Sequence, residues 1–94
     1  MTTLSGAELK IAISILPGWS LEADELVHHW TFVDFPAAMS FVNHVATLAE
    51  QAGHHPDIDI RYNKVRLALV SHDAGGITDR DISMAKQISA ILTP

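Results

Sequence analysis

The sequence contains no cysteine, few basic residues and no long apolar run. Without cysteine there is no disulfide, no thiol nucleophile, no iron–sulfur cluster and no cysteine-ligated zinc. Lysine and arginine total six against eleven acidic residues, and no basic run occurs, so we expect no nucleic-acid partner. The apolar runs are too short to span a bilayer. The N-terminal residues lack the basic and apolar regions of a signal peptide, so we expect a cytoplasmic protein with no membrane partner.

The 94 residues, of which 48% are hydrophobic, suffice for a single domain over residues 1–94. A chain of this size buries roughly 60–65% of its unfolded surface, which leaves a thin margin for stability. We therefore expect the chain to self-associate. The unusual feature of the composition is histidine, which occurs six times.

Apolar residues recur at intervals of three and four in three segments, and this spacing predicts three helices. Residues that cap or stop a helix flank each segment. They are Ser5 with Glu8 and Pro17-Gly18 for the first helix, Asp34 and Gly53 for the second, and Thr78 for the third.

Strand patterns lie between these helices. A short edge strand is predicted at 19–21 and a strand at 26–33, with a turn at Asp24-Glu25 between them. Alternation with a period of two then predicts a hairpin of strands 57–62 and 65–70, with its turn at Asn63-Lys64. Hairpins separated by helices favour the α+β class. We expect a four-stranded antiparallel sheet with about three helices packed on one face.

Three histidines lie where regular structure is predicted to end. His54 and His55 follow the second helix, and His72 follows the second strand of the hairpin. The predicted turn sets residue 55 opposite residue 72, so the three imidazoles should converge at one end of the sheet. Glu50 lies one helical turn before His54, and Asp81 lies in the first turn of the last helix. Such a group of imidazoles and carboxylates could perform general acid–base chemistry.

Simpler interpretations exist for each of these residues. The pair His54-His55 could have no other role than to interact with the negative end of the helix dipole, and His72 could simply be solvated. Asp81 could be a capping-box acid, and Glu50 a solvated residue of a helix face.

The other three histidines, His28, His29 and His44, are interpreted as structural or surface residues. The spacings by which helices or strands present two histidines to one zinc ion are absent, so we expect no metal site.

The spacing of the candidate residues resembles the motif of the pterin-4a-carbinolamine dehydratases. The matching residues are Glu50-x₃-His54-His55-Pro56-x₅-Tyr62-x₉-His72-x₈-Asp81. The resemblance runs from about Trp19 to Leu92 and includes the glycine loop from Ser71 to Thr78. It departs mildly from the family pattern at Gly53, Ile58 and Ser71, which leaves the three histidines in place.

The resemblance implies that the chain removes water from a 4a-hydroxytetrahydropterin to give a quinonoid dihydropterin, without metal or cofactor. The residues matching His54 and His72 are the family's acid–base candidates, and the residue matching His55 mainly holds the pterin. Glu50 and Asp81 would orient imidazoles or bind the polar edge of the pterin. The resemblance also implies a homodimer or homotetramer, and an aromatic amino acid hydroxylase as the source of the substrate.

A second interpretation belongs to a different functional class. Relatives of the resembled fold act as a dimerisation partner of a transcription factor or as degenerate, chaperone-like assembly factors for Rubisco, so the alternative for this chain is a binding or assembly role without catalysis. Degenerate members of this kind tend to lose the motif histidines. Because His54, His55 and His72 are all present, the sequence favours the enzyme.

Overall fold

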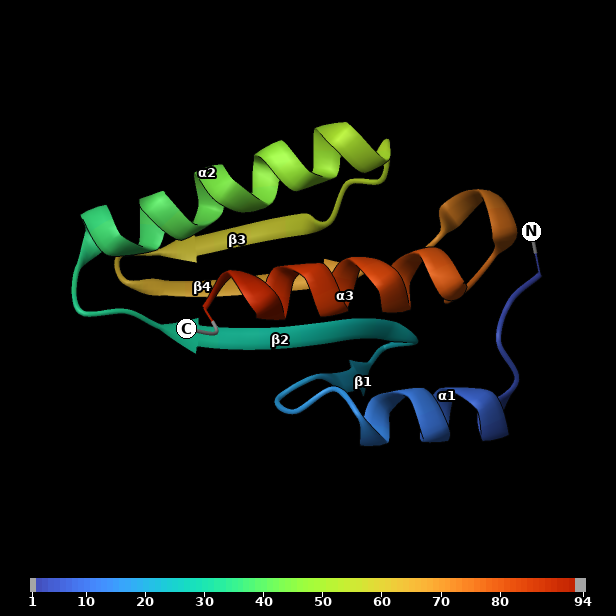
Figure 1. Cartoon of the computed structure of the whole chain (residues 1–94). Coiled ribbons are helices and arrows are strands. Elements are labelled where there is room, and N and C mark those ends of the chain that lie inside the picture. Colours follow the sequence, from blue (N-terminus) through green and yellow to red (C-terminus); the bar gives the residue numbers. More distant parts are fainter. Residues whose placement is uncertain (1, 93–94) are drawn as a thin grey trace.

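The computed structural model describes residues 2–92, which form one antiparallel sheet and its covering helices (Figure 1). The strands lie in the order β1-β2-β4-β3. Their bounds are Ser20–Glu22 for β1, Glu25–Thr31 for β2, Asp57–Arg61 for β3 and Lys64–Leu69 for β4. The helices are α1 (Gly6–Ser14), α2 (Phe35–Ala52) and α3 (Asp79–Ile91), and a 3₁₀ turn, η1, spans His72–Ala74. The expected α+β class and four-stranded antiparallel sheet are confirmed.

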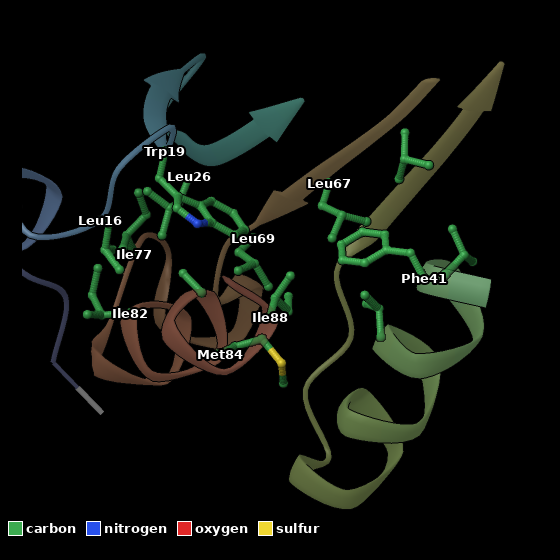
Figure 2. Close-up of a cluster of buried hydrophobic side chains, with 14 of the residues drawn as sticks. Leu16, Trp19, Leu26, Phe41, Leu67, Leu69, Ile77, Ile82, Met84 and Ile88 are labelled. Atoms are coloured by element: carbon green, nitrogen blue, oxygen red, sulfur yellow. The ribbon is translucent and has the colours of Figure 1, made fainter. Parts of the chain in front are cut away.

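One hydrophobic core joins the sheet to the helices (Figure 2). The strand pattern places Leu26, Leu67 and Leu69 on the face of the sheet that α2 and α3 cover, and all three are fully buried. Phe41 of α2 and Ile88 of α3 pack into the same cluster, which α1 joins through partly buried side chains. The three helices thus share one core, which determines where their ends lie relative to the sheet.

The ends of α2 are defined by the residues that the sequence indicates. Asp34 Oδ1 accepts the backbone N–H of Ala37 (2.9 Å) at the start of the helix. At the other end Gly53 adopts the left-handed conformation, with φ 64°, which glycine enters without steric penalty. Within the described part of the chain, no helix combines the length and the apolar content needed to cross a membrane.

The hairpin of β3 and β4 turns one residue earlier than predicted. Arg61 pairs with Lys64, so the turn residues are Tyr62 and Asn63 rather than Asn63 and Lys64. Tyr62 takes the left-handed conformation (φ 54°). Asn63 does not, because it is tied to Phe32 by its carbonyl, which accepts the Phe32 N–H (2.8 Å), and by its amide, which donates to the Phe32 carbonyl (2.7 Å).

This change of turn shifts the register by two residues. Asp57 pairs with Ala68, so continuation of the ladder would place residue 55 opposite residue 70. The predicted pairing of residue 55 with residue 72 is therefore wrong. His72 lies beyond the end of β4, in η1.

His28 lies on the core face of β2, among aromatic rings. Its imidazole stacks on Trp30 with ring centres 3.9 Å apart and meets the edge of Trp19 at 5.2 Å. Its Nδ1–H donates to the carbonyl of His29 (2.9 Å). Desolvation in this position lowers the pKa of His28 below its ordinary value of 6.5. This packing agrees with the interpretation of His28 as a structural residue.

The lowered pKa predicts the pH dependence of stability. Below about pH 6.5 the unfolded chain binds a proton at residue 28 that the native state resists, so the free energy of unfolding should fall as the pH drops through that value. His28→Phe keeps a ring in the cluster and removes the titration. Denaturant unfolding of both proteins at pH 7.5, 6.5 and 5.5 should show a smaller loss for the variant. An identical loss in both would contradict the assignment.

Candidate functional site

A buried carboxylate, that of Asp81, joins three parts of the chain. Asp81 is fully buried in the first turn of α3. Its Oδ2 accepts the backbone N–H of Thr78 (2.9 Å) and the hydroxyl of Ser71 (2.9 Å). Its Oδ1 contacts Nε2 of His54 at 2.5 Å. Asp81 is therefore both a capping-box acid and the partner of a candidate histidine, so the two interpretations of this residue hold together.

The directions of these hydrogen bonds follow from the donors available. Ser71 has a single hydroxyl hydrogen and gives it to Asp81, so its oxygen accepts the hydrogen of the Thr78 hydroxyl (2.8 Å). Thr78 Oγ1 in turn accepts the backbone N–H of Arg80 (3.2 Å). Every group that faces the Asp81 carboxylate can thus donate to it, as an ionised carboxylate requires. Nε2 of His54 then carries the hydrogen of its bond, and neutral His54 keeps a lone pair on Nδ1.

The end of α2 brings His54 to this carboxylate. The left-handed turn at Gly53 ends the helix, and the backbone N–H of His54 donates back to the Ala49 carbonyl (3.2 Å). The chain then turns inward, so that the His54 side chain is only 10% exposed and meets a carboxylate 27 residues further along the sequence.

His55 points the other way and pairs with Glu50. Its Nε2 contacts Oε2 of Glu50 at 2.5 Å, and the two side chains are 61% and 78% exposed. Exposed ion pairs add little to stability, because water screens them and both side chains lose freedom. The pair therefore contributes little to the free energy of unfolding. Glu50 is a solvated residue of α2 that also hydrogen-bonds to His55.

His72 is exposed in η1, at the end of the sheet where α2 ends and α3 begins (Figure 1). The turn is built on the carbonyl of Ser71, which accepts the backbone N–H groups of Ala74, Gly75 and Gly76 at 3.0–3.2 Å. Gly75 takes φ 80°, which favours glycine. The structure thus brings His72 and the pair His54-His55 to the same end of the sheet, although not through the predicted register.

A hollow of about 290 Å³ lies beside His54. It is lined by Ala52, His54, Asp79, Arg80, Ser83, Met84 and Gln87. His55 and His72 do not line it. Arg80 is fixed by Asp73 of η1, to which its Nη2 donates at 2.5 Å, and this hydrogen bond lowers the pKa of Asp73. Sequence reasoning missed Arg80, Ser83 and the role of Ser71, because nothing in their spacing sets them apart from ordinary polar residues of a helix or a loop.

The remaining histidines lie elsewhere. His29 pairs with Glu22 on β1 (3.1 Å), His28 belongs to the aromatic cluster, and His44 is exposed on α2. Among residues 2–92, no three histidine or acidic side chains are grouped so that they could hold a metal ion.

Comparison with known proteins identifies the family. The family model described as pterin 4 alpha carbinolamine dehydratase matches residues 2–91. The chain belongs to this family. A relative from Chloroflexus aurantiacus is 55% identical over 98% of this chain and 99% of its own, and one from Acidobacterium capsulatum is 56% identical over 98% and 100%. Both carry the provisional name pterin-4-alpha-carbinolamine dehydratase.

Solved structures show the same fold with other named roles. A transcriptional coactivator/pterin dehydratase from Brucella melitensis is 33% identical, with a TM-score of 0.92 over 96% of this chain and 98% of its own. A pterin dehydratase-like protein described as a RuBisCO assembly factor in the alpha-carboxysome is 20% identical, with a TM-score of 0.65 over 80% and 87%. The second likeness shows the fold alone.

The Asp81 network predicts the behaviour of Asp81→Asn. The amide can accept from Thr78 and Ser71 with its oxygen only if its NH₂ group faces His54, so Nε2 must then become an acceptor and the hydrogen must move to Nδ1. We expect a folded variant destabilised by about 1–3 kcal/mol. ¹⁵N NMR of the imidazole should report the exchanged tautomer. Retention of the Nε2–H tautomer would contradict the network.

Proposed function

We propose that the protein is a pterin-4a-carbinolamine dehydratase, which removes water from a 4a-hydroxytetrahydropterin to give a quinonoid dihydropterin. The observation that carries the proposal is the buried bond between His54 and Asp81, beside an open hollow. A histidine held in this way is oriented by a carboxylate and keeps a lone pair for proton transfer, which is the arrangement that general acid–base catalysis uses.

The reaction needs two proton transfers and one bond cleavage. A base takes the proton from N5, the N5 electron pair forms the double bond to C4a, and the C4a hydroxyl leaves as water after an acid protonates it. Nδ1 of His54 is suited to be the base, because Asp81 stabilises the imidazolium that forms. His72, exposed at the same end of the sheet, is suited to be the acid. Each positioned group contributes on the order of 10²–10⁴-fold.

Binding of the pterin is assigned to the exposed pair. His55 gives its Nε2 hydrogen to Glu50, so the Nδ1 lone pair can accept a hydrogen bond from an N–H group of the polar pterin edge, outside the core. The pterin ring presents carbonyl, amide and amine groups along one edge, so an oriented acceptor there favours binding through the amide and amine hydrogens. No step in this scheme calls for a metal or a cofactor. We infer that the substrate comes from an aromatic amino acid hydroxylase, whose reaction leaves this carbinolamine behind, in the cytoplasm.

Three alanine variants separate catalysis from binding. We expect His72→Ala to lower kcat by roughly 10²-fold, which is about 2.7 kcal/mol in the barrier. His55→Ala should mainly raise KM, because it removes a contact made in the ground and transition states alike. His44→Ala, on the exposed face of α2, is the matched control and should change neither constant more than a few-fold. A stopped-flow assay, with the carbinolamine generated in situ, gives both constants.

Circular dichroism checks the fold of each variant, and dialysis of the wild type against a chelator tests independence from metal. The assignment would be wrong if His72→Ala folded and kept its full rate while His44→Ala lost it. Loss of activity on removal of a stoichiometric metal ion would overturn the metal-free scheme.

Self-association is a separate part of the proposal. Exposed apolar side chains occur on α1, at its C-cap and next to α2, with Ile11 at 70%, Ile15 at 60% and Val33 at 85% exposure. Together with the small core of a 94-residue chain, they support a homodimer or homotetramer. Light scattering at micromolar concentration should give a mass of two or four chains. A mass equal to that of one chain, 10.2 kDa, would refute it.

The alternative is a binding or assembly role without catalysis. The named roles of the two solved relatives favour testing it, since one is called a coactivator as well as a dehydratase and the other an assembly factor. The same stopped-flow assay separates the two classes. A folded wild type that leaves the decay of the carbinolamine unchanged would reject the enzyme and favour the binding role.

A further inference from the structure

Ser71 stands between the two candidate acid–base histidines. Its side chain donates a hydrogen bond to Asp81, the carboxylate that holds His54. Its backbone carbonyl accepts the three N–H groups that fold the turn carrying His72. It is also the residue directly before His72. Of the groups that bond to Asp81, it is the one that belongs to the loop rather than to the helix cap or to the end of α2.

The Ser71 hydroxyl is placed to orient other side chains and not to contact a substrate. Ser71 is 1% exposed, so its oxygen does not meet a ligand in the hollow. It has two partners, Asp81 Oδ2 at 2.9 Å and Thr78 Oγ1 at 2.8 Å, and both are buried. Both of these hydrogen bonds are therefore directed inward, and the one that Ser71 donates goes to the carboxylate.

The effect on Asp81 depends on rotation of the carboxylate. The backbone N–H of Thr78 bonds to Oδ2, but a single donor leaves the carboxylate able to turn about that contact. The second donor, from Ser71, reaches the same oxygen from another direction. Two donors on Oδ2 fix the plane of the group, and with it the direction in which Oδ1 meets Nε2 of His54.

We propose that Ser71 is a positioning residue for the dehydratase reaction: its buried hydroxyl fixes the Asp81 carboxylate and thereby the orientation of His54. The inference rests on the proposed function for its kinetic consequence, but its structural part, the setting of His54 by Ser71, stands on the contacts alone. It acts through Asp81 and is distinct from the roles given to His54, His55 and His72.

Ser71→Ala removes the hydroxyl and keeps the backbone carbonyl that folds the His72 turn. We expect kcat to fall by about tenfold and KM to stay within twofold, since the misdirected group is the base and not a binding contact. Ser71→Thr keeps an oxygen and its hydrogen and should restore kcat to within threefold of the wild type. The matched control is Ser40→Ala, an exposed serine on α2, which should leave both constants unchanged.

A second readout does not depend on turnover. In the wild type the Nε2–H of His54 is held by Asp81 and should exchange slowly with water. In ¹H–¹⁵N NMR spectra of the full chain, Ser71→Ala should exchange this hydrogen at least about tenfold faster, while Ser71→Thr and Ser40→Ala should match the wild type. This measurement also tests the proposal if the threonine variant fails to fold.

The outcomes separate this proposal from the dehydratase assignment. Faster exchange in a folded Ser71→Ala, with an inactive wild type, would support the positioning role and reject the dehydratase function. An active wild type and a folded Ser71→Ala with unchanged kcat and unchanged exchange would overturn the positioning role and leave the function intact. A fall in kcat that Ser71→Thr does not restore, with unchanged exchange, would also overturn it.

Discussion

The burial of one carboxylate organises this end of the molecule. A charged group taken out of water destabilises the fold unless donors replace its hydration. Asp81 obtains them from the cap of its own helix, from the loop after β4 and from the end of α2. Because all three donors must be present together, the folded state that satisfies Asp81 also brings His54 against α3 and the His72 turn beside them. The fold and the candidate site thus depend on the same bonds.

The two pairs of histidine and carboxylate differ in environment rather than in chemistry. His54 and Asp81 are buried, so their bond acts in a medium that screens it weakly and fixes one geometry. His55 and Glu50 make a bond of the same kind, but both side chains are largely exposed. The buried pair suits a proton-transfer group, because the direction of its free ring nitrogen is fixed. The exposed pair suits a contact that must remain open to an arriving ligand.

Local chemistry made most of the fold predictable, and the failures have local causes too. The caps at Asp34 and Thr78 and the stop at Gly53 are properties of a few adjacent residues, so the sequence sufficed for them. The turn of the hairpin was misplaced because Asn63 is held by Phe32, which lies 31 residues earlier in the chain. A hydrogen bond to a residue so far away in the sequence cannot be predicted from the residues of the turn alone.

The candidate site shows the same division. The positions of His54, His55, His72, Glu50 and Asp81 near the predicted ends of helices and strands made them candidates, and the family motif matched the same five residues. Which histidine pairs with which carboxylate became visible only in the folded structure. The sequence placed Glu50 one turn before His54, yet its partner is His55, because the left-handed turn at Gly53 sends His54 inward. Ser71 had no distinguishing pattern, since its importance lies in two buried contacts to Thr78 and Asp81.

The fold by itself does not decide what this chain does. A protein described as an assembly factor shares the architecture at 20% identity, and one named both coactivator and dehydratase shares it at 33%. The β-sheet and its helices are therefore a scaffold compatible with several roles, and function must be argued from the side chains at the end of the sheet where His54 and Asp81 lie. The capping box of α3 accounts for Asp81 and Thr78, but it does not require the imidazole of His54, which turns inward and meets Oδ1 of Asp81. A surface that only contacts another protein gains nothing from a buried pair of imidazole and carboxylate such as His54 and Asp81. Proton transfer does gain from it, because the carboxylate fixes the direction of the base. This difference favours chemistry at this end of the sheet.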